Sequence, residues 1–139
     1  MKKYVGNVIH GLGKGKDFGF PTVNIKLIDN NLDIESGAYA VQIMIYRDVM
    51  NCVETAHNGM LYVGTRPTLN LKEVTIEIHI FDFNEDIYDR QISFQIVHKI
   101  REEMRFNSTE NLIQQLHQDK ETVYNFFQNH NSQFVIRNS

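Results

Sequence analysis

The sequence predicts a mainly β protein, a closed antiparallel six-stranded barrel with one C-terminal α-helix packed on it. Segments of alternating apolar and polar residues, separated by turn-forming residues, fill the chain up to about residue 106. From Ser108 onward, the apolar residues recur at helical spacing instead. A chain of 139 residues is long enough to bury one sizeable core and too short for two. We therefore expect a single domain over residues 1–139, with the barrel at about 4–106, the helix at about 108–129 and a tail at 130–139.

The first part of the chain predicts three strands. Residues 4–9 alternate weakly, residues 20–27 contain a proline near their start, and residues 38–46 alternate clearly after Gly37. Residues 29–33 are rich in Asp and Asn, which favour a turn at the surface. The candidate core positions are Phe20, Val23, Ile25 and Leu27 in the second strand, and Tyr39, Val41, Ile43 and Ile45 in the third.

The stretch after the third strand is ambiguous. Residues 48–55 fit a strand edge with a turn. His57-Asn58-Gly59 contains the Asn-Gly pair that is typical of tight turns between strands. We therefore expect a turn at residues 57–59 and a further strand within residues 60–69, which contain an Arg-Pro pair near their end.

Residues 73–83 show the clearest alternation in the chain, with one apolar face and one polar face. In an ordinary barrel the polar face contacts water, and a single glutamate on it is most often a solvated surface residue. The apolar face consists of Val74, Ile76, Ile78 and Ile80, and the polar face of Glu73, Thr75, Glu77 and His79.

A polar turn at residues 84–86 follows this strand. Ile87 and Tyr88 are expected to begin the next strand, and residues 91–100 alternate as a strand does. One side of this last segment is formed by Ile92, Phe94 and Ile96, while the position of His98 is left open.

The C-terminal helix is predicted from Ser108, which is a favourable N-cap residue, with Glu110 in the first turn. We expect the helix to pack across the mouth of the barrel, and its paired phenylalanines to belong to the core. Beyond His130, the polar tail is expected to be mobile or to dock weakly. The apolar positions of the helix are Leu112, Ile113, Leu116, Val123, Phe126 and Phe127.

The composition limits the classes of function. With 42% hydrophobic and 22% charged residues the chain is typical of a soluble globular protein, and a net charge of −3 disfavours a nucleic-acid binder. Cys52 is the single cysteine, so no intramolecular disulfide can form and the composition fits a reducing cytoplasm. The N-terminal residues are not followed by an apolar signal region, and no apolar run is long enough to span a membrane. We therefore expect a cytoplasmic protein that is neither exported nor embedded in a membrane.

Residues 10–24 contain the most distinctive local pattern. Gly11, Gly13 and Gly15 stand at alternate positions, so the backbone can approach a ligand closely, and Lys14 and Lys16 add positive charge there. Backbone amides and ammonium groups arranged in this way suit an anion such as a polyphosphate. A glycine-rich hairpin turn with solvated lysines fits the same residues, and both interpretations stay open.

The residues after this loop favour the phosphate interpretation. In a strand, Thr22 and Asn24 project from one face while Val23 points to the other. A hydroxyl and an amide oxygen are neutral oxygen ligands suited to Mg²⁺ that is also bound by phosphates and water. The spacing excludes both the Walker A loop, because Leu12 follows Gly11, and the dinucleotide fingerprint, because Lys16 replaces its third glycine.

The run from Gly6 to Asn24, G-N-V-I-H-G-L-G-K-G-K-D-F-G-F-P-T-V-N, resembles the start of the riboflavin kinase domain. That domain occurs alone in eukaryotes and as the C-terminal half of bifunctional bacterial FAD synthetases. The family pattern is close to G-x-V-x-x-G-x-x-R-G-x-x-L-G-F-P-T-A-N. Three positions depart from it, Lys14, Phe18 and Val23, and none of these departures removes a predicted ligand.

Further segments are similar to the family in the same order along the chain. Residues 60–69 contain G-T-R-P-T, which resembles the family's turn beside the nucleotide, and E-I-H-I places Glu77 at the family's catalytic glutamate. D-I-Y-D has Asp89 where the family has glycine, and R-E-E-M-R-F has Glu102 where the family has proline. These two departures leave open the backbone of that turn and of the flavin loop.

The resemblance implies transfer of the γ-phosphoryl group of ATP to the ribityl 5′-hydroxyl of riboflavin, which gives FMN. It also implies the barrel fold, Mg²⁺ as cofactor and ATP as co-substrate. The implied site residues are Glu77 for catalysis; Gly11, Gly13, Lys16, Thr22, Asn24, Ile80, Asp82 and Tyr88 for ATP; Arg101, Met104 and Phe106 for the flavin; and Thr22 and Asn24 for the metal.

The expected partners are riboflavin and FMN together with ATP and ADP, with no nucleic acid and no membrane, and we expect a monomer for the isolated domain. The alternative is an inactive flavin-binding or regulatory barrel, which is disfavoured because Thr22, Asn24 and Glu77 are all present. No segment resembles the H-x-G-H signature of the nucleotidyltransferase half, so this chain is expected to stop at FMN. Whether it is a natural monofunctional enzyme or half of a bifunctional one is left open.

Overall fold

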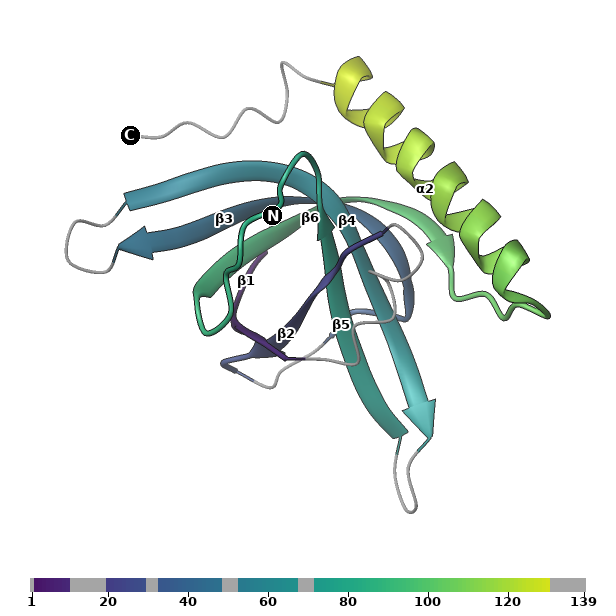
Figure 1. The fold of residues 1–139 in the computed structure, drawn as a ribbon, viewed down its shortest axis with the longest axis horizontal. Coiled ribbons are helices and arrows are strands. Elements are labelled where there is room, and N and C mark those ends of the chain that lie inside the picture. Colours follow the sequence, from purple (N-terminus) through teal and green to yellow (C-terminus); the bar gives the residue numbers. More distant parts are fainter. Residues whose placement is uncertain (1, 11–19, 30–32, 49–52, 68–71, 131–139) are drawn as a thin grey trace.

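The computed structural model describes residues 2–10, 20–29, 33–48, 53–67 and 72–130. The predicted nucleotide residues Gly11, Gly13 and Lys16 and the C-terminal tail lie outside these ranges. The described elements are strands β1 (Lys3–Ile9), β2 (Val23–Leu27), β3 (Gly37–Asp48), β4 (Val53–Pro67), β5 (Lys72–Ile80) and β6 (Gln91–Glu102), and helix α2 (Thr109–Asn129) (Figure 1).

The strands form a closed barrel in the order β1-β2-β5-β4-β3-β6, with β6 pairing back to β1. Every neighbouring pair is antiparallel. Closure leaves no unpaired edge along the ring, which is the usual way in which a small antiparallel sheet satisfies its backbone groups. The predicted fold class, a six-stranded antiparallel barrel with a C-terminal helix, is confirmed.

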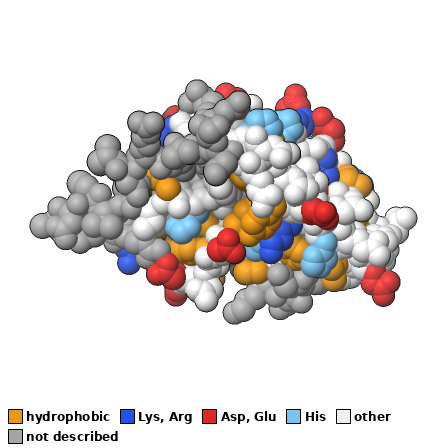
Figure 2. All heavy atoms as spheres, turned by 90° about the horizontal axis from the view of Figure 1, so that it is seen from above, with side chains coloured by type: hydrophobic (Ala, Val, Ile, Leu, Met, Phe, Trp, Pro, Cys, Tyr) orange, Lys and Arg blue, Asp and Glu red, His pale blue; other side chains and the backbone are white. Residues whose placement is uncertain are grey.

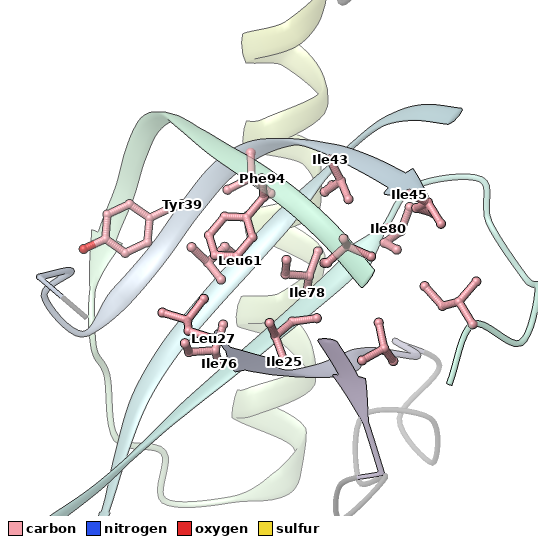
Figure 3. Close-up of a cluster of buried hydrophobic side chains, with 14 of the residues drawn as sticks. Ile25, Leu27, Tyr39, Ile43, Ile45, Leu61, Ile76, Ile78, Ile80 and Phe94 are labelled. Carbon is pink, nitrogen blue, oxygen red and sulfur yellow. The ribbon is translucent and has the colours of Figure 1, made fainter. Parts of the chain in front are cut away.

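The inside of the barrel is filled by the inward-facing residues of all six strands, as the alternation predicts. Figure 3 shows these side chains converging between the strands, with α2 behind the wall. Val74 is an exception on the apolar face of β5, because its side chain is 45% exposed. The labelled core residues are Ile25, Leu27, Tyr39, Ile43, Ile45, Leu61, Ile76, Ile78, Ile80 and Phe94.

A second apolar cluster lies between the barrel and α2. The helix packs on the outer faces of β3, β4 and β6, so the prediction that it crosses the barrel mouth is wrong. The physical reason is that outward-facing positions of these strands are apolar, and burying them requires a partner outside the wall. Phe127 is buried there, as predicted. The buried members are Phe20, Ala40, Met60, Phe81, Leu116, Val123 and Phe127.

The helix begins as the sequence predicts. Ser108 is the N-cap, and its hydroxyl accepts a hydrogen bond from the Asn111 amide at 3.1 Å. Glu110 lies in the first turn, where a negative charge is favourable. No helix in the described part of the chain is long and apolar enough to cross a membrane.

The predicted turn at residues 57–59 is wrong, because β4 continues through these residues without interruption. Gly59 pairs with Ile80 in β5, and a Cβ atom at Gly59 would lie 2.5 Å from the His79 carbonyl oxygen. The glycine therefore permits close approach of two strands rather than a turn. The β3–β4 connection falls at residues 49–52, which lie outside the described residues.

Ile87 and Tyr88 do not begin a strand; they lie in a turn, and β6 starts at Gln91. Asp89 adopts a φ of 65°, which is the left-handed region that a glycine favours and that Asp tolerates better than most residues. Its amide donates to the Val8 carbonyl oxygen at 2.9 Å. The turn that has a glycine in the family therefore has a glycine-like backbone here.

The pairing of β6 with β3 is interrupted twice, between Ala38 and Tyr39 and between Ala40 and Val41. Each interruption places one additional β6 residue opposite the same length of β3, as in a β-bulge. His98 therefore lies on the outside, where its ring stacks on Phe126 of α2 at a centroid distance of 4.7 Å. Ile92 and Phe94 are buried inside the barrel, as predicted.

Candidate functional site

The register of the barrel brings together residues from five strands on its outer face. Asn24 pairs with Glu77, Glu77 with Tyr62, Tyr62 with Ala38, and Ala38 with Arg101. Residues paired directly in an antiparallel sheet project to the same side. The neighbours of Glu77 along β5 point into the core, so this row of five residues lies on the outer wall. We call it the outer row.

Glu77 lies in the outer row, beside two of the residues predicted to bind metal. The Thr22 hydroxyl donates a hydrogen bond to Glu77 Oε1 at 3.2 Å, and Asn24 stands opposite Glu77 in the ladder. All three side chains are half-buried. The structure therefore brings together the predicted base and the two predicted metal ligands, which are far apart in the sequence.

The donor set at this place fits a magnesium ion. A hydroxyl, an amide and a carboxylate offer oxygen ligands, and Mg²⁺ in nucleotide sites takes one or two protein ligands together with phosphates and water. Over the ranges that the structure describes, no three His, Cys, Asp or Glu side chains gather to form a protein-only metal site.

His79 also lies on the outer face of β5, but the rings of Phe20 and Phe81 pack against it and it is only 7% exposed. The sequence placed it on a polar face in contact with water, so that expectation is wrong for His79. Its ring Nδ1–H donates to the Pro21 carbonyl oxygen at 2.7 Å, because a carbonyl can only accept. Burial lowers the pKa of His79, the hydrogen bond to Pro21 raises it in part, and Lys120 lowers it further.

Arg101, at the other end of the outer row, is held by a residue that sequence reasoning missed. Its guanidinium donates to both carboxylate oxygens of Asp119 in α2, with Nε–Oδ1 at 2.9 Å and Nη2–Oδ2 at 2.8 Å. The Asp119 side chain is 2% exposed and that of Arg101 is 16% exposed. A buried pair in this geometry fixes the helix to the barrel wall.

Two neutral side chains complete the surroundings of Asp119. The Tyr62 hydroxyl donates to it at 3.3 Å and the Gln115 amide at 2.9 Å. Burial raises the pKa of Tyr62, and the negative charge of Asp119 raises it further. Tyr62 therefore stays protonated and connects the outer row to the helix.

The sequence did contain a signal for Asp119. It follows Leu116 by three residues and precedes Val123 by four, so it stands in the apolar stripe of the helix. A carboxylate in such a stripe is rarely buried unless it has a partner. The pattern could therefore have indicated a buried ion pair, although not the identity of its arginine.

The predicted flavin residues Met104 and Phe106 follow β6, next to the first half of α2. They line an open hollow of about 300 Å³ between the 104–107 segment and the helix. Met104 is 45% exposed and therefore accessible to a ligand. The other lining residues are Arg105, Asn107, Asn111, Gln114, Gln115 and Gln118, which offer several amide groups.

The predicted nucleotide residues fall at three places. Tyr88 stacks on His10 at a centroid distance of 3.8 Å, directly before the glycine-rich segment. The Ile80 side chain is buried in the barrel core, so only its backbone is available to a ligand. Asp82 has a φ of 54°, and its carboxylate accepts a hydrogen bond from Tyr124 of α2 at 3.3 Å.

The face of the molecule in Figure 2 carries mixed charge. There, acidic, basic and histidine side chains are interspersed rather than gathered by sign. This agrees with the modest net charge of −3.

The chain belongs to the riboflavin kinase family. The family model described as "Flavokinase: Riboflavin kinase" matches residues 2–127, which include every described strand and most of α2. The family expected from the sequence motifs is confirmed.

Three relatives illustrate the match. A bifunctional riboflavin kinase/FMN adenylyltransferase of Haemophilus influenzae is 37% identical over 122 residues, and one of Bacillus subtilis is 33% identical over 127. The alignments cover 88% and 89% of this chain but 37% and 38% of those proteins, so the chain spans little more than a third of their length. An RNA-binding riboflavin kinase of Bacillus subtilis is 36% identical, with 92% of this chain and 52% of that protein covered. The absence of a nucleic-acid partner therefore stays a prediction.

Solved structures show the same architecture. A Streptococcus pneumoniae protein described as a macrolide-efflux protein superposes with a TM-score of 0.78 at 32% identity, covering 88% of this chain and 38% of that chain. The riboflavin kinase of Trypanosoma brucei superposes with a TM-score of 0.65 at 19% identity, covering 91% and 79%. The second likeness supports the fold alone.

Proposed function

We propose that the chain is an active riboflavin kinase that transfers the γ-phosphoryl group of ATP to the 5′-hydroxyl of riboflavin. The observation that carries this proposal is the meeting of Glu77, Thr22 and Asn24 on the outer wall, with a Thr22–Glu77 distance of 3.2 Å. Membership of the family supports the choice of substrates. No observation favours the inactive alternative.

The proposed step forms a bond between the 5′-oxygen of riboflavin and the γ-phosphorus and breaks the bond to the β–γ bridging oxygen, which leaves with ADP. Glu77 orients the hydroxyl and accepts its proton as the bond forms. Phosphoryl transfer has a loose transition state, so most of the catalysis lies in positioning and charge neutralisation.

Thr22 and Asn24 would hold Mg²⁺ through their side-chain oxygens. When bound, Mg²⁺ neutralises the negative charge that develops on the phosphate oxygens. The Thr22 hydroxyl would then turn its hydrogen toward Glu77 and its lone pairs toward the cation, which is consistent with its present bond to Glu77. Tyr88 and His10, together with the segment at 11–19, are the proposed contacts of the nucleotide.

The flavin is proposed to occupy the hollow beside Met104 and Phe106. These two side chains offer apolar contact, while Asn111, Gln114 and Gln118 offer amides to the polar edge of the ring. Arg101 is already paired with Asp119, so we propose that it acts on the flavin by fixing α2 rather than by contributing a free charge.

The test is to incubate the purified protein with riboflavin, ATP and Mg²⁺ and to separate the flavins by chromatography. The proposal predicts FMN, formed only when ATP and Mg²⁺ are both present. Retention of unchanged riboflavin by a folded protein would instead identify the inactive flavin-binding alternative. We propose in addition a cytoplasmic location and a monomeric state, and size-exclusion chromatography checks the latter.

A further inference from the structure

We propose that His79 is a positioning residue for residues 21–24, which we call the metal-binding segment. In this proposal, its bond to Pro21 holds Thr22 and Asn24 against Glu77. This inference rests on the proposed function, because it concerns the same metal ligands. His79 itself does not touch the substrates in this proposal.

The first step of the argument is the end of a strand ladder. The β2–β5 ladder pairs Asn24 with Glu77 and Val23 with Ile78, and stops there. Two residues before Val23, the backbone of Pro21 has no N–H to continue a ladder. The His79 side chain donates to the Pro21 carbonyl oxygen at 2.7 Å, so a side chain joins this residue to β5 beyond the end of the ladder.

The second step is that Thr22 is held on both sides. On its carbonyl side Thr22 enters β2, and on its amide side Pro21 accepts the hydrogen bond from His79. Phe20, before Pro21, is buried against the helix. Without that bond, the backbone before Thr22 could rotate about Val23, and the 3.2 Å contact of the Thr22 hydroxyl with Glu77 would be lost for part of the time. Metal sites that take few protein ligands depend strongly on such supporting bonds.

The third step is that the imidazole cannot move away. Its ring meets Phe20 at a centroid distance of 5.6 Å and Phe81 at 5.7 Å, both edge-on. Phe20 in turn contacts the ring of His117 in α2 at 4.8 Å. The docking of the helix therefore fixes the ring, and the ring fixes the metal-binding segment.

A buried histidine can also be a purely structural core residue, and two substitutions separate the possibilities. His79→Phe keeps a ring among the aromatic neighbours but removes the donor. His79→Asn removes the ring but places an amide N–H near the position of Nδ1, so it can keep the bond to Pro21. His98→Phe, on the outer wall of β6, is the matched control, because it makes the same chemical change away from the segment.

Three quantities are measured. They are the Mg²⁺ concentration that gives half-maximal turnover, the affinity of the protein for Mg²⁺ with ADP by calorimetry, and the affinity for riboflavin by fluorescence.

We expect His79→Phe to weaken Mg²⁺–ADP binding by about 10- to 100-fold, the usual effect of losing a supporting bond at a metal site. Its affinity for riboflavin should stay within about twofold of the wild-type value. Asn24→Ala removes a proposed ligand directly and gives the scale of the full effect. His79→Asn should bind Mg²⁺–ADP with an affinity close to that of the wild type, even if the variant melts at a lower temperature.

Two results would overturn the proposal. One is a folded His79→Phe protein that binds Mg²⁺–ADP as tightly as the wild type. The other is a His79→Asn protein that binds Mg²⁺–ADP no more tightly than His79→Phe does. If His79→Phe does not fold, ¹⁵N NMR of the wild-type imidazole decides, since a proton found on Nε2 instead of Nδ1 excludes the bond to Pro21. Failure of the wild type to form FMN would count against the proposed function, whereas the NMR and the calorimetry test His79 without turnover.

Discussion

At the scale of single residues, Glu77 is the side chain on which the proposed chemistry depends. Glu77→Gln keeps the size and one acceptor oxygen but cannot take the proton of the alcohol. A positioned general base contributes about a hundredfold to ten-thousandfold in rate, so we expect kcat for FMN formation to fall by that factor. Riboflavin and ATP should still bind, since the change affects the transition state more than the ground state.

The control for Glu77 is Glu121→Gln, the same change at an exposed position of α2. It should leave the kinetics unchanged. Near-normal turnover by Glu77→Gln, measured by chromatography of the flavins, would show that another group is the base.

His79 gives a prediction for the effect of pH on stability. Its pKa in the fold lies below the usual 6.5, chiefly because it is buried. The unfolded chain therefore binds more protons than the fold just below that pH, and the free energy of unfolding must fall as the pH decreases through about 6.5. The positive charge of Lys120 on α2 also lowers the pKa of His79.

This prediction is checked by urea unfolding of the wild type and of His79→Phe between about pH 5 and pH 8. The difference between their free energies of unfolding should shrink from pH 8 to pH 5, because the variant has no imidazole to protonate. A difference that is independent of pH would mean that His79 titrates normally in the fold.

At the scale of elements, the Arg101–Asp119 pair joins α2 to β6. Removing one partner of a buried pair leaves the other charge without compensation, and such changes cost about 3–5 kcal/mol. We expect that loss in the free energy of unfolding of Asp119→Ala, measured with urea. The double variant Asp119→Leu with Arg101→Met should be more stable than Asp119→Ala, because neither charge is then left alone.

Close strand approach gives a second prediction at this scale. A methyl group at Gly59 would lie 2.5 Å from the His79 carbonyl oxygen, and the backbone there cannot move without disturbing β5. We expect Gly59→Ala to lower the free energy of unfolding by about 1–3 kcal/mol. Gly64→Ala, in the same strand, would meet two side-chain oxygens, those of Thr75 at 3.2 Å and Glu103 at 3.8 Å, and should cost less. Equal losses for the two variants in thermal unfolding would contradict this reading of Gly59.

At the scale of the whole molecule, the chain corresponds to little more than a third of the length of its bifunctional relatives. It contains no H-x-G-H segment of the nucleotidyltransferase type. We therefore predict that the purified protein, given riboflavin, excess ATP and Mg²⁺, accumulates FMN and forms no FAD. Mass spectrometry of the flavin products over a long incubation checks this, and FAD from pure protein would contradict it.

Much of the fold was predictable because it depends on local patterns. The alternation of residues 73–83 assigned Glu77 and Ile78 to opposite faces, and Ser108 indicated the start of the helix. One failure comes from a contact between two different strands. The Asn-Gly pair at 58–59 looks like a turn, yet here the glycine serves the packing of β4 against β5, which no short window of sequence reveals.

By itself, the sequence determined which residues share a face of each segment, the family, and the three side chains proposed for catalysis and metal binding. Only the tertiary structure decided that these side chains meet: Thr22 and Glu77 are 55 residues apart, and Pro21 and His79 are 58 apart. It also decided that α2 packs on the outer wall, where Asp119 is buried against Arg101, and that His79 is buried with the Pro21 carbonyl oxygen as its partner. The physical reason is that periodicity fixes the direction of a side chain relative to its own strand or helix. What then covers that side chain depends on the register and packing of segments distant in the chain.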